Sequence, residues 1–251
     1  MSHEQLLILL PAFFVIAGLY TSVGHAGASG YLAAMALVAV APETMRPTAL
    51  ALNILVATFT WYRFAKAGYV SWRALWPFML GSVPLAALGG SLRLSSGIYY
   101  VLAGVALAVS ALALAWRAFG RPPGESPADR ARIPVVPAIG CGAAIGLLSG
   151  LTGTGGGIFL SPIVLLSGWA GPRHTGGITA PFILANSAVA LAAGTATWAS
   201  LPAELPWLAC AGFAGAVTGT WLGLRRLSTR WLLAAMALVL TIAAVKLILF
   251  A

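Results

Sequence analysis

Apolar and polar stretches alternate along the whole chain and divide it into two groups of five apolar segments. The first group lies near residues 5–22, 28–41, 47–66, 72–92 and 97–118, and the second near 134–151, 155–169, 176–195, 203–224 and 229–250. A helix of about 20 apolar residues crosses the hydrocarbon core of a bilayer. The pattern therefore predicts an all-α polytopic membrane protein, with a polar stretch at 120–132 between the two groups.

The two groups resemble each other in sequence. Gly18–Ser22 aligns with Gly146–Gly150, and at the same offset His25–Leu32 aligns with Gly153–Leu160. Each match is weak alone, but their shared order indicates an internal duplication. The organisation that it predicts is a first membrane repeat at 1–118, a linker at 119–133 and a second membrane repeat at 134–251.

The basic residues predict how the segments are oriented. If the chain reverses at every connection, eleven of the 14 basic residues collect on one side, namely Arg63, Lys66, Arg73, Arg117, Arg121, Arg130, Arg132, Arg173, Arg225, Arg226 and Arg230. The other side receives Arg46, Arg93 and Lys246. Basic residues favour the cytoplasmic side, so the linker is expected in the cytoplasm and both termini in the periplasm. Because each group has an odd number of segments, the two repeats are expected to have inverted topology.

A glycine-rich stretch interrupts the second group. Five glycines fall within the eight residues 150–157, and each interior glycine costs a helix roughly 1 kcal/mol relative to alanine. Unwound backbone within a membrane must be buried in protein or line a polar cavity. The second segments, 28–41 and 155–169, are also short for a span. We therefore expect the first two segments of each half to form a broken or re-entrant Gly-rich hairpin, which is typical of a transporter's binding site.

Composition further restricts the class of protein to which the chain can belong. The chain is 60% hydrophobic and 8% charged, against about 25% charged residues in soluble domains. The net charge of +9 comes from basic residues at segment ends, so it indicates membrane topology and no nucleic-acid partner. Cys141 and Cys210 lie in apolar segments with no His or Cys at ligand spacing. They are expected to be small core residues, and no disulfide, metal or cofactor is predicted; lipids are the expected surroundings.

The polar residues near the breaks favour an anion. The five acidic residues lie at segment ends or in the linker, which argues against a cation site or a carboxylate proton relay. Hydroxyl and amide groups, together with the exposed N–H groups of helix starts, suit a small oxyanion. The candidate substrate-binding residues are Ser22, Gly24, His25, Gly27, Ser29, Asn53, Thr152, Gly153, Thr154, Gly155, Gly156 and Asn186.

The glycines also have a purely structural interpretation. Glycine permits tight helix crossing, and that is the role expected where glycines recur at four-residue spacing, at Gly142, Gly146 and Gly150 and at Gly215, Gly219 and Gly223. Helix crossing rarely needs consecutive glycines. For Gly155, Gly156 and Gly157 the binding-site interpretation is therefore favoured over packing.

The other candidates likewise have two interpretations each. His25 is either a hydrogen-bonded interior residue or a proton-coupling group, since an ordinary imidazole titrates near pH 6.5. Asn53 and Asn186 either bind the solute or tie helices together. Arg46 is expected to be an anchor at the membrane interface, with the lining of an outer vestibule as the alternative.

The stretch Ser149–Gly157, followed by apolar residues and Pro162, resembles the motif of the sulfite exporter TauE/SafE family. The first-half copy departs from it, with His25, Ala26, Ala28 and Ser29 where the family usually has more glycine. The resemblance implies a non-enzymatic permease of the bacterial inner membrane that moves a sulfur-containing anion, such as sulfite, thiosulfate or an organosulfonate. The two halves would rock about the site in alternating access.

Two alternatives remain open at this point. A non-transporting membrane partner or assembly protein would not need polar groups gathered at two matched breaks. An intramembrane hydrolase would use His25 as base with Ser22 or Ser29 as nucleophile, but it lacks the orienting acid of a triad. A homodimer is compatible with the permease and with both alternatives.

Overall fold

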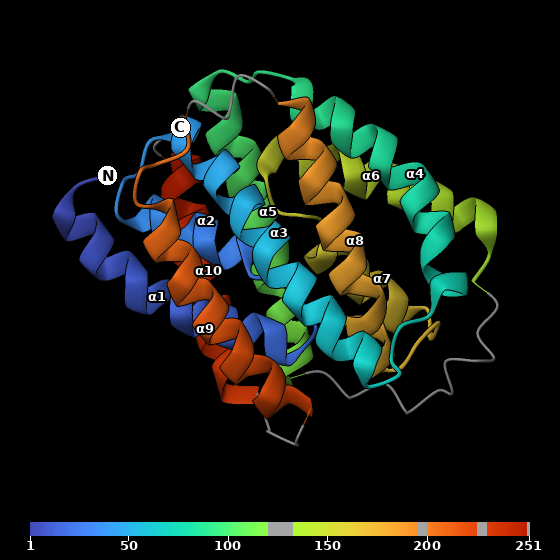
Figure 1. Ribbon diagram of the computed structural model, residues 1–251. Coiled ribbons are helices and arrows are strands. Elements are labelled where there is room, and N and C mark those ends of the chain that lie inside the picture. Colours follow the sequence, from blue (N-terminus) through green and yellow to red (C-terminus); the bar gives the residue numbers. More distant parts are fainter. Residues whose placement is uncertain (120–132, 195–199, 225–229, 250–251) are drawn as a thin grey trace.

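The computed structural model describes residues 1–119, 133–194, 200–224 and 230–249 of the chain. Within these ranges the secondary structure consists of ten α-helices (Figure 1). They are α1 (His3–Ser22), α2 (Ala28–Leu37), α3 (Pro42–Lys66), α4 (Trp72–Ser91), α5 (Ser96–Phe119), α6 (Val135–Thr152), α7 (Gly157–Leu166), α8 (Pro172–Ala193), α9 (Leu205–Leu224) and α10 (Arg230–Leu249). Each predicted segment becomes one helix, which confirms the all-helical class. The predicted linker lies almost wholly outside the described residues.

The third helix of each half begins earlier than hydropathy indicates. α3 starts at Pro42 and α8 at Pro172, four or five residues before the expected starts. Proline is well suited to a first helical turn because its φ is already helical and its missing N–H is not needed there. Polar residues such as Glu43 and Arg173 follow these prolines. They interrupt the apolar pattern by which hydropathy detects a segment, although they belong to the first turn of the helix.

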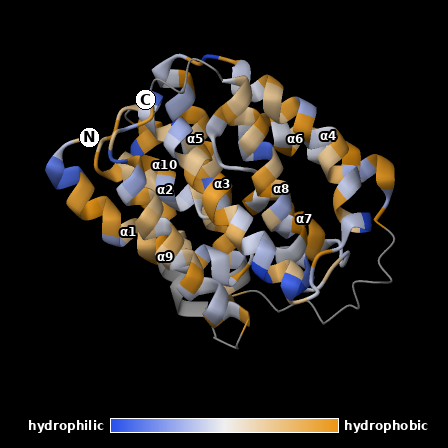
Figure 2. Cartoon of the chain, in the orientation of Figure 1, coloured by the Kyte–Doolittle hydropathy of each residue, from blue (hydrophilic) through white to orange (hydrophobic). Residues whose placement is uncertain are grey.

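Six helices of the described part are long and apolar enough to cross a membrane: α1, α4, α5, α6, α8 and α9. By contrast, α2 and α7 have only ten residues each, a length of about 15 Å. That is half of a typical hydrocarbon core, so neither can cross alone. The six long helices support a multi-pass membrane protein, and Figure 2 shows hydrophobic residues over the helix middles and hydrophilic ones near several helix ends.

Two glycine-lined helix pairs flank the bundle. α4 packs along α6, and α1 packs along α9; in Figure 1 these pairs lie on opposite sides of α3 and α8. A Cβ atom at any of six glycines would overlap a backbone carbonyl of the partner helix. These are Gly142, Gly146 and Gly150 against α4, and Gly215, Gly219 and Gly223 against α1. The packing role predicted for glycines at four-residue spacing is confirmed.

The helices α3 and α8 pack against each other through the middle of the molecule, and α5 packs against α10. The main hydrophobic core gathers around α1, α2, α5 and α10, with a smaller cluster between α4, α6, α7 and α8. Large apolar side chains such as Leu112, Val136 and Leu249 remain exposed, as expected of helices that face lipid. The middle of the bundle is therefore where polar groups are shielded from lipid.

Candidate functional site

The first interruption separates α1 from α2 at residues 23–27, here called break 1. Its backbone takes left-handed conformations at Gly24 (φ 86°) and at Gly27 (φ 108°), which is the N-cap of α2. Residues other than glycine rarely adopt such φ values. A Cβ at Gly24 would also overlap the backbone of Gly176 in α8. Break 1 therefore lies directly against a helix of the other half.

The second interruption separates α6 from α7 at residues 153–156, here called break 2. Three of its four residues are left-handed glycines: Gly153 (φ 83°), Gly155 (φ 73°) and Gly156 (φ 79°), the N-cap of α7. A Cβ at Gly155 would overlap the amide nitrogen of Asn53 in α3. The consecutive glycines are thus required by backbone conformation and by the close approach of α3. The two N-caps are Gly27 and Gly156, so the structural match is shifted by one residue from the alignment of Gly27 with Gly155.

His25 links break 1 to the second half of the chain. Its Nε2 lies 3.2 Å from the carbonyl oxygen of Gly157, at the start of α7, and 2.8 Å from Oγ of Ser161. Ser161 in turn lies 3.2 Å from Oγ1 of Thr179 in α8. A carbonyl can only accept, so the contact with Gly157 needs a proton on Nε2. A buried chain of three polar side chains therefore runs from break 1 across α7 to α8.

The two predicted asparagines are fully buried. Asn53 donates from Nδ2 to Oγ of Ser187 in α8, at 3.2 Å. Its Oδ1 has no hydrogen-bond partner within the described residues, and neither amide atom of Asn186 has one there. Leaving a buried polar group unsatisfied costs about 1–3 kcal/mol. Buried polar groups are nearly always hydrogen-bonded, so these atoms are suited to bind a ligand or a water molecule.

The starts of α2 and α7 add backbone donors. Neither N-cap, Gly27 or Gly156, provides a side-chain hydrogen bond to its helix, although both helix starts are buried. The first N–H groups of a helix lack partners within it and carry the positive end of its dipole. Two buried helix starts without side-chain caps thus meet the requirement for binding an anion.

The remaining candidates are already hydrogen-bonded. Ser22 donates to the carbonyl of Leu19 at 2.6 Å, and Ser29 pairs with the hydroxyl of Tyr20 at 2.7 Å. Oγ1 of Thr152 and Oγ1 of Thr154 lie 3.1 Å apart. The structure therefore gathers His25, Asn53 and the glycines of break 2 around contacts between the halves. It assigns Ser22 and Ser29 to bonds within the first hairpin.

Sequence reasoning missed three hydroxyl residues of this region: Ser161, Thr179 and Ser187. Ser187 directly follows Asn186 in an apolar segment, which is a signal that could have been used. Ser161 lies one helical turn after Gly157 and Thr179 lies in the first half of α8, where nothing in the pattern shows which way they face. Hydroxyls in membrane helices most often bond to their own backbone, so their roles needed the structure.

Arg46 is not the interfacial anchor that was expected. Only 7% of the residue is exposed, and its guanidinium donates to the carbonyls of Gly89, Gly90 and Leu92 at the end of α4. These carbonyls lack partners within the helix. They draw the charged group inward, so the anchor interpretation is wrong and the vestibule alternative stays open.

Together, the membrane-length helices, the two buried glycine breaks and the polar groups between them define the class of multi-pass membrane transporters with interrupted helices. Comparison with known proteins agrees. The chain belongs to the sulfite exporter TauE/SafE family, whose model matches residues 9–247. It is also 42% identical, over 241 residues, to the probable membrane transporter protein y4hK of Sinorhizobium fredii, covering 94% of this chain and 96% of that protein. No solved structure matches it.

Proposed function

We propose that the protein is a secondary transporter for a small sulfur-containing anion, such as sulfite, thiosulfate or an organosulfonate, in the bacterial inner membrane. The observation that carries the proposal is the set of buried amide atoms of Asn53 and Asn186 that lack partners within the described residues, together with two buried helix starts that lack side-chain caps; Asn53 lies against Gly155 of break 2. The N–H donors among these groups are neutral, so they can hold an anion by hydrogen bonds and still release it.

The anion would lie where break 2 meets α3 and α8. Asn186 can donate from Nδ2. Amide oxygen and nitrogen are assigned from the hydrogen-bond network, so exchanging them in Asn53 lets Ser187 donate to the oxygen and turns the amino group toward the anion. His25, bonded to Gly157, would supply a titratable charge on the opposite side of the α7 start. A protonated imidazole strengthens anion binding, which makes His25 the proposed proton-coupling residue.

The proposed inverted repeat is supported by the helix pairs. Exchanging α1–α5 with α6–α10 turns the α1–α9 pair into the α6–α4 pair, and the α2–α3 pair into the α7–α8 pair. It leaves the α3–α8 and α5–α10 pairs unchanged, and all of these pairs are in contact. A two-fold axis between the halves has this effect, and the odd number of segments predicted for each half favours an axis in the membrane plane. With the charge bias of the connections, it supports periplasmic termini, a cytoplasmic linker and two repeats at 1–118 and 134–251.

The test is flux into proteoliposomes that contain the purified protein, with labelled sulfite, thiosulfate and sulfoacetate supplied in turn. We expect saturable uptake of at least one anion, and competition among anions that share a sulfonate or sulfite group. Empty liposomes and a Gly155→Leu variant serve as controls. Absence of protein-dependent flux for all three anions, from protein that remains folded, would contradict the proposal.

A hydrolase would require a different nucleophile from those predicted. His25 contacts Ser161, whereas Ser22 and Ser29 bond within the first hairpin. Ser161 also contacts Thr179. This arrangement suits a hydrogen-bond chain better than a triad. A serine-reactive phosphonate that labels Ser161 only when His25 is present would reverse that preference.

A further inference from the structure

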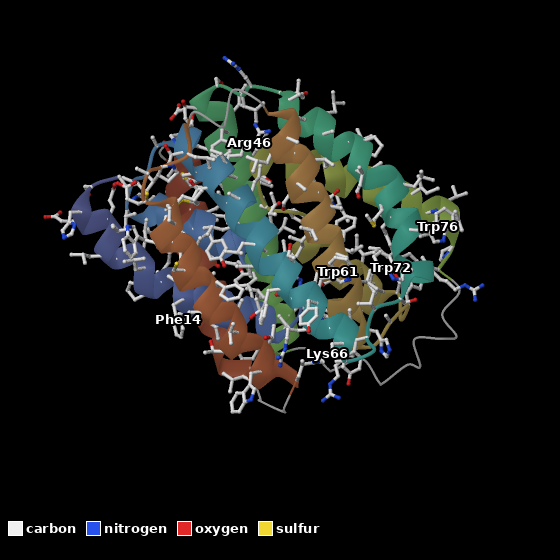
Figure 3. All side chains as sticks on the ribbon, viewed as in Figure 1. Phe14, Arg46, Trp61, Lys66, Trp72 and Trp76 are labelled. Atoms are coloured by element: carbon white, nitrogen blue, oxygen red, sulfur yellow. The ribbon has the colours of Figure 1, made fainter. Side chains whose placement is uncertain are left out.

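A second polar region lies at the end of the bundle where α3 and α5 begin and α4 ends; Figure 3 labels Arg46 there. It contains a cavity of about 260 Å³, here called the Arg46 pocket. Its polar lining comes from Glu43, Arg46, Arg93, Ser96, Tyr99 and Ser200. The volume is sufficient for a small oxyanion or sulfonate with part of its hydration shell.

Arg46 gives the pocket a buried positive charge. Its guanidinium bonds to three carbonyls at 2.6–3.0 Å, but its Nε has no hydrogen-bond partner within the described residues. Among those residues the ion pair found is between Met1 and Glu204, so Arg46 has no carboxylate partner there. Helix C-terminal carbonyls carry about half a negative charge. They therefore leave part of the arginine charge uncompensated at the pocket wall.

The exposed charges of the pocket have opposite signs. Arg93 adds a positive charge, whereas Glu43 adds a negative one and accepts from Ser96 at 3.4 Å. Both are exposed, so water and salt screen them more than they screen Arg46. The net charge of the three side chains is positive, and the least screened of them is the arginine. The pocket therefore favours an anion over a cation.

The pocket also adjoins break 2. The Cγ of Arg46 lies 3.1 Å from the position that a Cβ of Gly153 would take. From the other wall, the hydroxyl of Tyr99 donates to the carbonyl of Thr152 at 3.4 Å. The residues that line the pocket thus contact the last residue of α6 and the first residue of break 2. An anion in the pocket would be separated from break 2 by a single layer of side chains.

We propose that the Arg46 pocket is an anion-capture site, where an oxyanion or sulfonate binds before it reaches the site between the breaks. Binding in the pocket depends only on its own charges and donors. The onward step rests on the proposed transport function, and under the proposed orientation the pocket opens to the periplasm. Arg46 therefore has two roles, since it caps α4 and attracts the anion.

The test uses a single thiol as a local reporter in detergent-purified full-length protein. Cys141 and Cys210 are replaced by alanine, and Ser96→Cys introduces a thiol in the pocket. Its reaction rate is measured with the anionic sulfonatoethyl and the cationic trimethylammonioethyl methanethiosulfonate reagents. Thiol reactivity affects both rates equally, and the intrinsic difference between the two reagents is the same at every position. The ratio of the two rates divided by the ratio at a control position therefore reports the difference in local potential. Ser95→Cys is the matched control, since Ser95 is an exposed neighbour outside the pocket lining.

We expect the ratio of the anionic to the cationic rate to be higher for S96C than for S95C by about threefold or more, the size of effect expected for a unit charge at several ångströms. Adding Arg93→Gln should lower the ratio and adding Glu43→Gln should raise it; both residues are exposed, so neither change endangers the fold. At constant ionic strength, thiosulfate should slow the reaction of S96C and leave that of S95C unchanged. Equal rate ratios for S96C and S95C, or equal protection at the two positions, would overturn the proposal.

The flux assay separates this proposal from the transport proposal. Protection of S96C by thiosulfate without flux of any of the three anions would support the pocket and contradict transport. Flux without protection would support transport and overturn the pocket. If both hold, Arg93→Gln should raise the anion concentration for half-maximal flux several-fold and leave the maximal rate unchanged.

Discussion

Both breaks are formed by left-handed glycines, but the side chains that they carry differ in chemistry. Break 1 has two left-handed glycines and contributes His25, the one ionisable side chain of the two breaks. Break 2 has three left-handed glycines and contributes only backbone and hydroxyl groups. Each lies against the third helix of the opposite half, break 1 on α8 and break 2 on α3. The two breaks thus share the shape of the turn, while their side chains differ: break 1 has an ionisable group and break 2 has only neutral ones.

The largest expected effect is a loss of protein stability when break 1 is altered. Gly24→Ala would place a methyl group on the backbone of Gly176, which cannot move without shifting α8. Overpacking of this kind costs about 1–3 kcal/mol or more, in addition to roughly 1–2 kcal/mol of left-handed strain. Gly68→Ala is the matched control, because Gly68 has φ 78° and open space around it. Thermal unfolding in detergent should show a much larger loss for Gly24→Ala; equal losses would show that strain alone matters.

Break 2 should respond more in function than in stability. Gly155→Ala would place a methyl group on side chains of the proposed site, those of Asn53, Ile183 and Ser187, which can shift to accommodate it. Flux should fall about tenfold or more, the consequence of losing some 1.4 kcal/mol of binding. The control is Gly168→Ala, with the same strain (φ 66°) and nothing nearby. If both variants transport alike, break 2 does not contact the solute.

The asparagines test whether the two halves contribute equally. Asn186→Ala removes a buried amide that has no protein partner in the described structure, so it should weaken binding without destabilising the fold. A hydrogen bond to a charged group contributes about 1.5–3 kcal/mol, which corresponds to roughly 10–100-fold in the dissociation constant. Asn53→Ala should show a similar loss of binding together with lower stability, because it also breaks the bond to Ser187. Measured thiosulfate affinity that is unchanged in either variant would remove that residue from the site.

The smallest expected effect is a change in pH dependence. If His25 gains a proton as pH falls, the added positive charge strengthens anion binding, so wild-type flux of thiosulfate should rise from pH 8 toward pH 5.5. His25→Gln keeps a donor for Gly157 and should flatten that dependence with little change in yield. His174→Gln is the control, since His174 contacts Tyr69 outside the site. A His25→Gln variant with the wild-type pH profile would exclude His25 from coupling.

The sequence alone predicted the ten helices and the place of both breaks, because apolar length and glycine content are local properties. It also singled out Asn53, Asn186 and His25, since polar groups in apolar segments are costly unless they have a role. It could not predict the bond from His25 to Ser161 or from Asn53 to Ser187. Those contacts depend on how α7 and α8 are rotated, and nearly uniform apolar helices give no pattern from which rotation can be read.

Arg46 illustrates a second limit of prediction from the sequence. Hydropathy places it at a segment end, where arginine normally extends toward water. The structure instead turns it toward the end of α4, because three carbonyls without helical partners lie within reach. That attraction depends on where α4 ends relative to α3, which is a property of the tertiary structure. The bond between Ser29 and the hydroxyl of Tyr20 was missed for the same reason, because it depends on how α2 packs against α1.

The glycine-lined pairs have a consequence for motion. α1 from the first half is locked to α9 from the second, and α6 is locked to α4 in the same way. Carbonyl groups seated against bare glycine leave no room for such partners to slide. In a cycle of alternating access, the moving bodies would therefore not be the two halves of the sequence but two composite blocks, each holding helices from both. Opening and closing in such a cycle would occur where α3 packs against α8, the two helices that carry Asn53 and Asn186.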